Sequence, residues 1–571
     1  MKKLTKDYDV IIIGGGATGA GTARDCALRG LSVLLVERFD FTAGATGRNH
    51  GLLHSGARYA VTDPESAEEC IKENMLLKRV ARHCVEDTGG LFITLPEDDL
   101  AFQKTFVEAC GKAGIEAEVI SPDEARNLEP AVNPELTGAV KVPDGAIDPF
   151  RLTTANVIDA RRHGADIITY HQVTGFLRTG DRIEGIVMRD VRTGEETAAS
   201  GKVTINAAGI WGHLVAKLAG IEINMFPAKG SLLIFGHRVN NKVINRCRKP
   251  SNADILVPGD TICLIGTTSD RIPFDQIDNM EVTPEEVDVL LREGQKLSPS
   301  LAYTRILRAY AGVRPLVAAD HDPSGRSISR GIVCLDHARR DGVEGFITIT
   351  GGKLMTYRLM AQEATDLACR KLGVEDKKCE TASLPLPGSE ESSVRIEHYD
   401  EKRDKEYVDK TYTRRMHIIE LPTEQLAAEG RHGTLAEEIQ FLDNVDEAMV
   451  CECEQVSVGE IEFAIDKLHV HNLINLRRRT RLGMGTCQGQ LCACRAAGLL
   501  DKADHCAERA IADLCSFVNE RWKGMYPVAW GETTSEIQFT SWLYSGVAGL
   551  DDWLKEHGPQ KNANGEIKYT L

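Results

Sequence analysis

The sequence lacks three features that would each define a class of protein. Its 571 residues hold no apolar run of the roughly 18 residues that a membrane-spanning helix needs. Acidic residues outnumber basic ones, 84 against 68, and the formal net charge of −16 argues against general nucleic-acid binding. The first residues, MKKLTKDYDVIIIGGG, contain neither an apolar h-region nor a cleavage site, so we expect no secretory signal. Any membrane contact should be peripheral or pass through a partner.

Closely spaced cysteines are also scarce over most of the chain. The 16 cysteines mostly occur singly, as in RDCALRG and EACGKAG. This pattern predicts buried free thiols in a reducing cytoplasm rather than a disulfide framework. The length predicts about two to four domains. The remaining composition, with 42% hydrophobic and 27% charged residues, is that of a soluble globular protein.

The clearest motif follows the first residues and reads DVIIIGGGATGAGTARDCALRGLSVLLVE. Residues 10–13 form a continuous apolar run, which is typical of a strand buried in a parallel sheet. A helix should follow and end near Leu28. The run LSVLLVE predicts a second buried strand that ends at Glu37.

Between these two strands the glycines form the pattern G-x-G-x-x-G. Gly14 permits a tight turn, Gly16 lets the backbone approach a pyrophosphate, and Gly19 lets helix and strand pack closely. Glu37 is placed to accept hydrogen bonds from the adenosine ribose. The pattern therefore predicts a dinucleotide site. Further cofactor-binding candidates around it are Ala17, Thr18, Arg38 and Thr46.

The glycine motif alone does not separate NAD from FAD. A second segment, VTINAAGIWG (residues 203–212), predicts another apolar strand that ends in small residues around Gly209. A return to the nucleotide this far downstream is typical of FAD-dependent oxidoreductases; the alternative is an ordinary core strand. We expect an α/β fold: a FAD-binding, doubly wound (Rossmann-type) domain with an inserted α+β substrate domain.

Cations are interleaved with glycine and histidine further along. ATGRNHGLLHSGARYA (residues 45–60) contains Arg58 and Tyr59 and predicts a loop near the cofactor rather than a core element. AYAGVRPL places Arg314 in an apolar run, where a cation needs a buried partner. That partner is either a bound phosphate or a structural carboxylate. ISRGIV contributes a further cation, Arg330.

The segment GFITITGGKLMTYRLMAQEATDLACRKLG predicts a strand, a Gly-Gly turn and an amphipathic helix. Lys353 should stand at the start of this helix. The amides of Gly351 and Gly352, aimed along a helix N-terminus, would form a second site for an anion or a carbonyl group.

Taken together, the glycine motif, GATGRNHGLLHSGARYA, GVRPL and GFITITGGKLMTYR resemble the FAD-dependent glycerol-3-phosphate dehydrogenases, over roughly residues 8–370. The tail described below makes the resemblance strongest to the anaerobic bacterial branch of that family. The resemblance implies oxidation of sn-glycerol 3-phosphate to dihydroxyacetone phosphate. Electrons would pass from FAD toward the quinone pool in anaerobic glycerol catabolism.

The resemblance also implies roles for particular residues. His54, Arg58 and Tyr59 stand where the family has a His-Gly-Gly-x-Arg-Tyr loop, with Ser55 in place of the first glycine. Aerobic relatives have a histidine after a Gly-Ser pair, but KGSLLIF has Leu232 there. A mechanism that uses that histidine as the base therefore does not transfer to this chain.

The chemistry of alcohol oxidation assigns the remaining positions. Hydride transfer to flavin needs removal of the hydroxyl proton and a clamp on the distant phosphate. We expect Arg314 and Arg330 to form the clamp. His54 is the candidate base, and Lys353 would stabilise the developing alkoxide or the reduced flavin.

A cysteine cluster marks the tail. MVCECEQ holds Cys451 and Cys453, and LGMGTCQGQLCACRAAGLL holds Cys487 and Cys492, so the pattern is C-x-C, 33 residues, C-x4-C. Four thiolates from two loops can hold zinc or a [2Fe–2S] cluster, and C-x-C is unusual for zinc. The segment also resembles a ferredoxin-like module fused to several flavin dehydrogenases, which favours [2Fe–2S]. Cys494, on the helix that follows, should belong to the core.

A basic run, NLRRRTRLGMGTC, precedes the second cysteine pair. Its arginines could offset the negative charge of a cluster or steer an acidic partner. The alternative is a solvated basic edge of the module. The arginines concerned are Arg477, Arg478, Arg479 and Arg481.

We expect three parts: a FAD-dependent oxidoreductase domain over residues 1–380, a charged linker and helical region over 381–445, and a small helical [2Fe–2S] module over 446–571. A flavin and a one-electron centre in one chain imply a relay to further redox subunits, one of them a membrane-bound iron–sulfur anchor. The protein would then lie at the cytoplasmic face of the bacterial membrane. The alternatives are a flavin amino-acid or opine dehydrogenase, and an electron-transfer adaptor without its own substrate.

Overall fold

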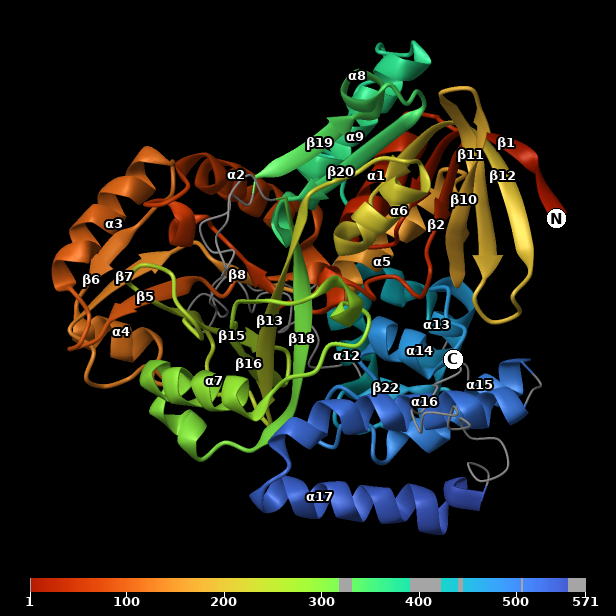
Figure 1. Cartoon of the computed structure of the whole chain (residues 1–571). Coiled ribbons are helices and arrows are strands. Elements are labelled where there is room, and N and C mark those ends of the chain that lie inside the picture. Colours follow the sequence, from red (N-terminus) through yellow and green to blue (C-terminus); the bar gives the residue numbers. More distant parts are fainter. Residues whose placement is uncertain (1, 318–330, 391–422, 440–444, 505–506, 553–571) are drawn as a thin grey trace, which may run out of the picture.

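Five parallel strands form the centre of the first of two large sheets (Figure 1). The computed structural model describes residues 2–317, 331–390, 423–439, 445–504 and 507–552. The parallel strands lie in the order β9, β2, β1, β12, β20. They are β9 (Asp166–Ile168), β2 (Val33–Val36), β1 (Lys2–Ile13), β12 (Glu196–Asn206) and β20 (Phe346–Gly351). The antiparallel strands β10 (His171–Thr179), β11 (Arg182–Asp190) and β19 (Ile332–Asp336) extend this sheet.

Both faces of the parallel strands are covered, which explains the continuous apolar run in β1. Val10 and Ile12 pack with apolar residues of three helices, whereas Ile11 and Ile13 pack with residues of β10, β11 and α6 on the opposite face. The three helices are α1 (Ala17–Leu28), α5 (Pro149–Arg162) and α9 (Tyr357–Leu372), and α6 spans Gly212–Leu218. The predicted α/β class and the predicted strand–helix–strand start are confirmed.

The second sheet has nine strands and comes from two separate stretches of the chain. The first stretch supplies β5 (Gly90–Thr94), β6 (Glu118–Ile120) and β7 (Gly138–Val142). The second supplies β13 (Met225–Phe235), β14 (Val243–Arg246), β15 (Ile255–Gly259), β16 (Ile262–Gly266), β17 (Asp270–Arg271) and β18 (Ile306–Val317). Parallel pairing of β14 with β5 joins the two stretches. The expected substrate domain is thus inserted twice, after β2 and after β12.

Helices of the inserted parts lie on the left of Figure 1, around this second sheet. They are α2 (Pro64–Val80), α3 (Leu100–Lys112), α4 (Pro122–Leu128) and α7 (Pro284–Leu297). The segment 45–60, predicted as a loop outside the core, is largely buried. Leu53 and Ala57 belong to a hydrophobic core, and β3 (Leu52–Leu53) pairs with β8 (Gly145–Ile147), which also pairs with β4 (Val85–Glu86). That part of the prediction is wrong, because glycine and serine allow close packing there.

The C-terminal module is a small helical body with its own core, drawn in blue in Figure 1. Ile461, Leu473, Leu476 and Ala496 are fully buried in that core. Its elements are α12 (Thr423–His432), β21 (Met449–Cys451), β22 (Val456–Ser457), α13 (Val458–Lys467), α14 (Leu473–Thr480), α15 (Cys492–Asp504), α16 (Ala507–Met525) and α17 (Gly531–Trp542). Most of the predicted charged linker, residues 391–422 and 440–444, lies outside the described residues.

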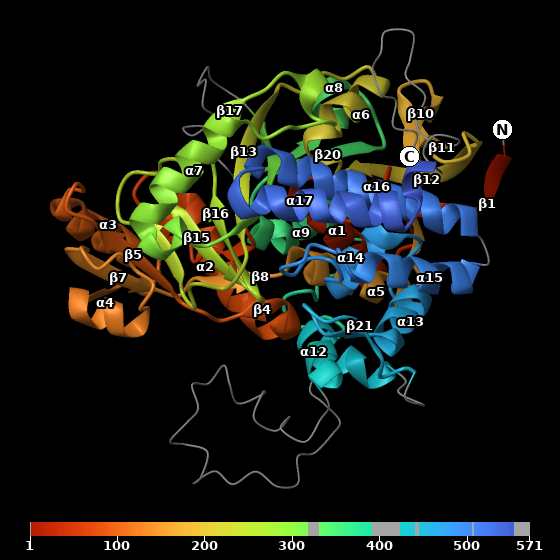
Figure 2. The same cartoon turned by 90° about the horizontal axis from the view of Figure 1, so that it is seen from below.

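The module packs directly against the FAD-type domain, with α14 next to α5 and α16 along β18 (Figure 2). The basic run makes this contact. Asp40 accepts from Arg478 (2.9 Å) and from Arg479 (2.6 Å), and Arg481 pairs with Asp260 and Glu454. The alternative of a solvated basic edge is therefore wrong: these arginines join two parts of the molecule. No described helix has the length and apolarity that a bilayer crossing requires.

Candidate functional site

A cavity of about 1240 Å³ lies where β1 and β12 end and extends to β18 and the turn after β20. The carboxyl ends of parallel strands are the usual place for a nucleotide ligand. The cavity brings together predicted residues from five separate stretches of the chain. They are Gly14, Gly16, Ala17, Thr18, Glu37, Arg38, Thr46, His54, Arg58, Tyr59, Gly209, Arg314, Gly351, Gly352 and Lys353.

The three glycines of the motif act as the spacing predicts. Gly14 has φ of 115°, which favours glycine. A Cβ on Gly19 would stand 1.9 Å from the Gly14 carbonyl oxygen, so Gly19 serves the packing of α1 on β1 and does not line the cavity. Gly16 lines the cavity, where the Ala17 amide donates to Thr46 Oγ1 (3.0 Å). The resulting open backbone at a helix N-terminus fits a pyrophosphate.

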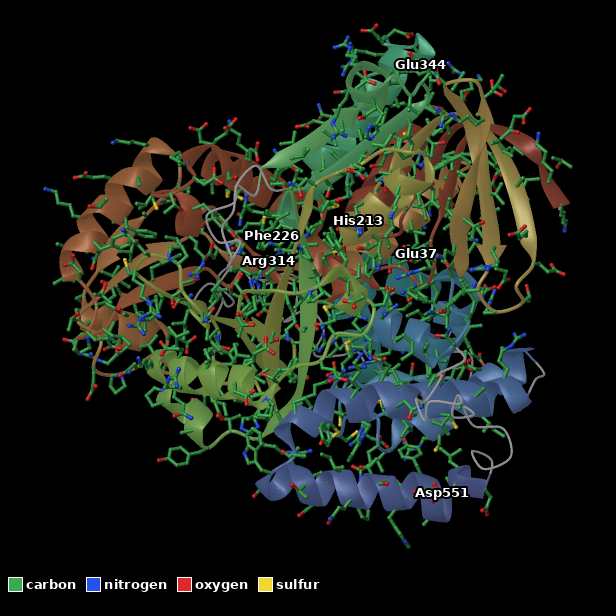
Figure 3. All side chains as sticks on the ribbon, viewed as in Figure 1. Glu37, His213, Phe226, Arg314, Glu344 and Asp551 are labelled. Carbon is green, nitrogen blue, oxygen red and sulfur yellow. The ribbon has the colours of Figure 1, made fainter. Side chains whose placement is uncertain are left out.

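Glu37 lies at the end of β2, as predicted for a ribose acceptor. Its two carboxylate oxygens accept from the amides of Gly15 (2.6 Å) and Phe39 (2.8 Å). Burial raises the pKa of Glu37, although these two amides act in the opposite direction. Each carboxylate oxygen has a second lone pair, so Glu37 can still accept a ribose hydroxyl. Figure 3 labels Glu37 on this side of the cavity and Arg314 on the other.

Arg38 covers the same end of the cavity. Its guanidinium lies 5.1 Å from the centre of the Trp211 ring and pairs with Asp278 (2.6 Å). Trp211 itself donates from Nε1 to Asp278 (2.8 Å). This arrangement holds a flat, cationic surface over the region where the adenosine end of a dinucleotide would lie.

At the opposite end, four side chains form an aromatic and cationic group. The His54 ring, 7% exposed, lies 5.7 Å from the His50 ring and 5.4 Å from the Tyr59 ring. Lys353 Nζ stands 4.7 Å from the centre of the Tyr59 ring. The predicted candidates His54, Tyr59 and Lys353 are therefore neighbours.

The departure from the family's loop pattern at Ser55 has a structural reason. Ser55 donates to Asp144 Oδ1 from both its amide and its hydroxyl, each at 2.7 Å. Asp144 is buried, and burial raises its pKa. A glycine could donate only its amide, so the serine adds a second anchor that fixes the loop carrying His54.

Arg58 pairs with a carboxylate of the substrate domain. Its Nη2 donates to Asp254 Oδ2 (3.1 Å) and to the Ser251 carbonyl oxygen (3.3 Å). Its Nη1 is buried without a hydrogen-bond partner among the described residues. Since Arg58 also lines the cavity, part of its guanidinium can serve a ligand while the rest is held by Asp254.

Arg314 lies on β18 opposite Ala228 of β13. Its guanidinium donates to Ser269 Oγ (3.3 Å) and to the carbonyl oxygens of Thr268 (3.1 Å) and Lys229 (3.4 Å), and it also contacts Thr267 Oγ1. These contacts fix the position of the guanidinium, which lines the cavity and can donate to an anion there.

The turn after β20 departs from the prediction in one respect. Gly351 and Gly352 have φ of 77° and 63° and line the cavity. The Gly352 amide, however, donates to the Gly331 carbonyl oxygen (3.0 Å), so it is not aimed at a ligand. The expectation that both amides serve an anion is wrong for Gly352. Arg330, the second predicted phosphate ligand, lies outside the described residues.

The four predicted metal-ligand cysteines form two hydrogen-bonded pairs, Cys451 with Cys492 and Cys453 with Cys487. The Cys487 thiol lowers the pKa of Cys453 to about 5, and the Cys492 thiol likewise lowers the pKa of Cys451. In the described part of the chain, no three His, Cys, Asp or Glu side chains gather around a single metal-ion position. The four cysteines, arranged as two thiol pairs, would hold a two-iron cluster better than a mononuclear zinc ion.

Cys494 is exposed, so its predicted place in the core is wrong. Two positions along a helix turn the side chain by about 200°, away from the face of its neighbour. Because Cys492 points inward, Cys494 has to point outward.

Sequence reasoning missed several residues of the cavity. His50 and Arg48 lie in the quoted loop, and a histidine and an arginine next to a nucleotide motif were a usable signal. Thr267 also lines the cavity, whereas Asp144 acts behind it by holding Ser55; both come from distant parts of the chain, and no local pattern marks them.

Comparison with known proteins agrees with this geometry. The family model described as "FAD dependent oxidoreductase" matches residues 9–358, and that described as "BFD-like [2Fe-2S] binding domain" matches residues 449–502. The fold and the two sites thus define a flavin-dependent oxidoreductase that binds FAD and, in its C-terminal module, a [2Fe–2S] cluster.

Similar curated proteins identify the family within this class of oxidoreductases. The chain is 61% identical to the A subunit of anaerobic glycerol-3-phosphate dehydrogenase from Escherichia coli strain K12, over 97% of this chain and 99% of that protein. It is 59% identical to the Haemophilus influenzae protein of the same name, over 95% and 94%. The chain belongs to the family of anaerobic glycerol-3-phosphate dehydrogenase A subunits.

Solved structures share the fold. The glycerol-3-phosphate dehydrogenase from Bacillus halodurans, complexed with FAD, superposes with a TM-score of 0.66 at 20% identity, covering 91% of this chain and 95% of that one. Glycine oxidase from Geobacillus kaustophilus superposes with a TM-score of 0.53 at 20% identity, covering 64% and 95%.

Proposed function

We propose that this protein oxidises sn-glycerol 3-phosphate to dihydroxyacetone phosphate. The observation that carries the proposal is the position of Arg314, which lines the same cavity as the glycine motif and is fixed there by hydrogen bonds to Ser269 and Thr268. A cation arranged in this way suits the phosphate of a small substrate. The names of the full-length relatives agree with this substrate.

Each residue of the site has its own role in the proposed reaction. Arg314, with Arg330, binds the phosphate, so that remote binding energy orients the carbon that carries the hydroxyl group. His54 takes the hydroxyl proton, and Lys353 and Arg58 stabilise the negative charge that develops on the oxygen. Tyr59 supports both His54 and Lys353 by ring contacts. FAD, when bound, would supply the hydride acceptor, and a cluster held by Cys451, Cys453, Cys487 and Cys492 would supply a one-electron carrier.

The geometry between the two cofactor sites supports this relay. A second cavity of about 2190 Å³ lies between the FAD-type domain and the module and is lined by Cys453. Phe39, Ala43, Arg48, Asn49 and His50 line both cavities, so the stretch 39–50 forms part of the wall between the flavin site and the cavity at the cluster ligands.

The proposal extends to the assembly. The relatives are each named as one subunit of a larger enzyme, which indicates further subunits. We place a membrane-bound iron–sulfur anchor among them, and the protein at the cytoplasmic face of the bacterial membrane. The domain limits 1–380, 381–445 and 446–571 and the four cysteine ligands are parts of the same proposal.

Anaerobic purification followed by visible and EPR spectroscopy tests the function. Added glycerol 3-phosphate should bleach the flavin and then produce the signal of the reduced cluster, whereas glycerol and amino acids at the same concentration should not. Bleaching by an amino acid instead would establish the amino-acid or opine dehydrogenase. Protein that holds no stoichiometric flavin would establish the adaptor.

A further inference from the structure

Exposed aromatic side chains gather at the C-terminal helical hairpin, α16 and α17. Most surface apolar residues of the described chain occur singly, but six large ones fall within residues 522–547. They are Trp522 (47% exposed), Tyr526 (68%), Trp530 (48%), Phe539 (55%), Trp542 (63%) and Val547 (61%). Clustered exposed aromatics mark interaction surfaces, since each costs solvation free energy when left in water. We call residues 522–547 the aromatic hairpin.

Helix α17 is apolar on two faces. Ile537 and Thr540 of α17, and Tyr544 in the helical turn Leu543–Val547 that follows it, recur at helical spacing and are buried. Phe539 and Trp542, also three residues apart, form a second stripe that is exposed. A surface helix that only had to cover its own domain would need one apolar stripe. The second stripe therefore serves a contact outside the described chain.

The buried face of the hairpin holds the loop of the cluster ligands. Tyr544 Oη donates to the carbonyl oxygens of Gly489 (2.8 Å) and Gln490 (3.0 Å), and Arg521 Nε donates to that of Gln488 (3.0 Å). Residues 488–490 lie between Cys487 and Cys492. The exposed stripe is thus about one helix diameter, ~10 Å, from the ligand loop. Cys453 lines the cavity on the flavin side, and so do Trp522 and Tyr526, whereas Phe539 and Trp542 do not line it.

Charge selects the kind of partner. Residues 522–552 contain four carboxylates (Glu532, Glu536, Asp551 and Asp552) and one basic residue, Lys523. Glu536 lies 3.8 Å from Arg305. Asp551 lies beyond the end of α17 (Figure 3). An anionic lipid surface would repel such a segment, because membrane-binding helices carry lysine and arginine on their polar faces. A protein surface with an apolar centre and a basic rim would be complementary to it.

We propose that the aromatic hairpin is the docking surface for the partner protein that takes electrons from the cluster, and that this partner presents an apolar patch rimmed by lysine or arginine. The proposal deepens the proposed function, on which it rests for the direction of electron flow. Docking there would place the acceptor next to the ligand loop and shield Phe539 and Trp542 from water.

Binding and electron transfer are measured separately on the full-length protein. The probe is inverted membrane vesicles from the producing cells, deleted for the gene of this chain. Phe539→Ser/Trp542→Ser should raise the concentration for half-maximal binding about tenfold or more, as loss of two central aromatic anchors does. The protein concentration for half-maximal quinone reduction should rise by the same factor. Flavin bleaching, the cluster EPR signal and the thermal unfolding temperature should stay unchanged. Met75→Ser/Val119→Ser, which removes two equally exposed apolar side chains elsewhere, is the matched control.

Two further experiments test the charge of the partner and whether it is a protein or a lipid surface. Glu532→Lys/Asp551→Lys should weaken binding severalfold at low salt, with the difference disappearing at high salt. Protein-free vesicles of phosphatidylethanolamine and phosphatidylglycerol should bind neither form. Two results would overturn the proposal. One is unchanged binding of Phe539→Ser/Trp542→Ser to the membrane vesicles. The other is binding to the protein-free vesicles by the wild type but not by this variant. Binding needs no turnover, so a protein that binds normally but is not bleached by glycerol 3-phosphate would contradict only the proposed function.

Discussion

At the scale of single residues, Gly16 decides whether the nucleotide binds. A Cβ at this position would stand 3.0 Å from Thr46 Oγ1, and the rest of a larger side chain would fill the space above the helix N-terminus. Gly16→Val should therefore abolish FAD retention, measured as flavin per chain, because the backbone can no longer approach the pyrophosphate. The cluster of the C-terminal module should persist. Normal flavin content in this variant would contradict the assignment of the nucleotide site.

Arg314 decides how well the phosphate binds. Arg314→Ala should raise KM for glycerol 3-phosphate with a loss of about 2–4 kcal/mol in transition-state binding, the cost of removing a charge-assisted contact from a partly buried site. Oxidation of unphosphorylated glycerol, measured with an artificial acceptor, should change far less. Arg314→Lys, which keeps the charge, should recover part of the loss. Equal losses on both substrates would show that Arg314 only holds β13 and β18 together.

Single residues also show which predictions the local sequence could support. The roles of Gly14 and Gly19 follow from spacing, since both act within one strand–helix turn. The second anchor of Ser55 could not be predicted, because Asp144 lies 89 positions away in the chain. The exposure of Cys494 could have been predicted from helical geometry, because a predicted ligand at Cys492 has to face inward.

At the scale of elements, the turn between α13 and α14 joins the module to the N-terminal oxidoreductase domain through a histidine. His469 Nε2 contacts Thr169 Oγ1 (3.0 Å), and burial, together with His471 and Arg479, lowers the pKa of His469 from near 6.5 to about 3. Folded protein therefore binds fewer protons than unfolded protein between these two values. The contribution of His469 to the free energy of unfolding should be fully present above about pH 6.5 and should decrease as the pH falls toward 3.

His469→Asn removes the titrating group and suits the positive φ of 58° at this position. The unfolding temperature should differ less between pH 7 and pH 5 for this variant than for the wild type. An equal pH difference in wild type and His469→Asn would show that His469 does not contribute.

The arginines of α14 show why the docking of this element was not predictable. Their sequence, RRRTR, is equally consistent with a solvated edge and with a surface for an acidic partner. The partner is internal: Asp40 lies more than 430 positions earlier and is 2% exposed. Only the folded chain brings these charges together, and burial away from water makes the pairing strong.

At the scale of the whole molecule, the arrangement of the two cofactor sites predicts separable half-reactions. Cys451→Ser/Cys453→Ser should leave flavin bleaching by glycerol 3-phosphate largely intact, because the flavin cavity and its lining do not depend on these thiols. Delivery of electrons to membrane quinone should fail, while small artificial acceptors still oxidise the flavin. A folded variant that reduced membrane quinone at the wild-type rate would exclude a relay through the cluster.

The sequence by itself determined the strand–glycine–helix start of the nucleotide site, the α/β class and the C-x-C and C-x4-C pattern, because each depends on residues that are neighbours along the chain. The tertiary structure decided the rest. It assembled the substrate domain from two insertions, placed Arg314 across the cavity from Glu37, paired each thiol of one loop with a thiol of the other, and joined α14 to Asp40. The physical reason is that these contacts become favourable only after burial removes water. Separation along the chain does not predict which groups come into contact in the fold.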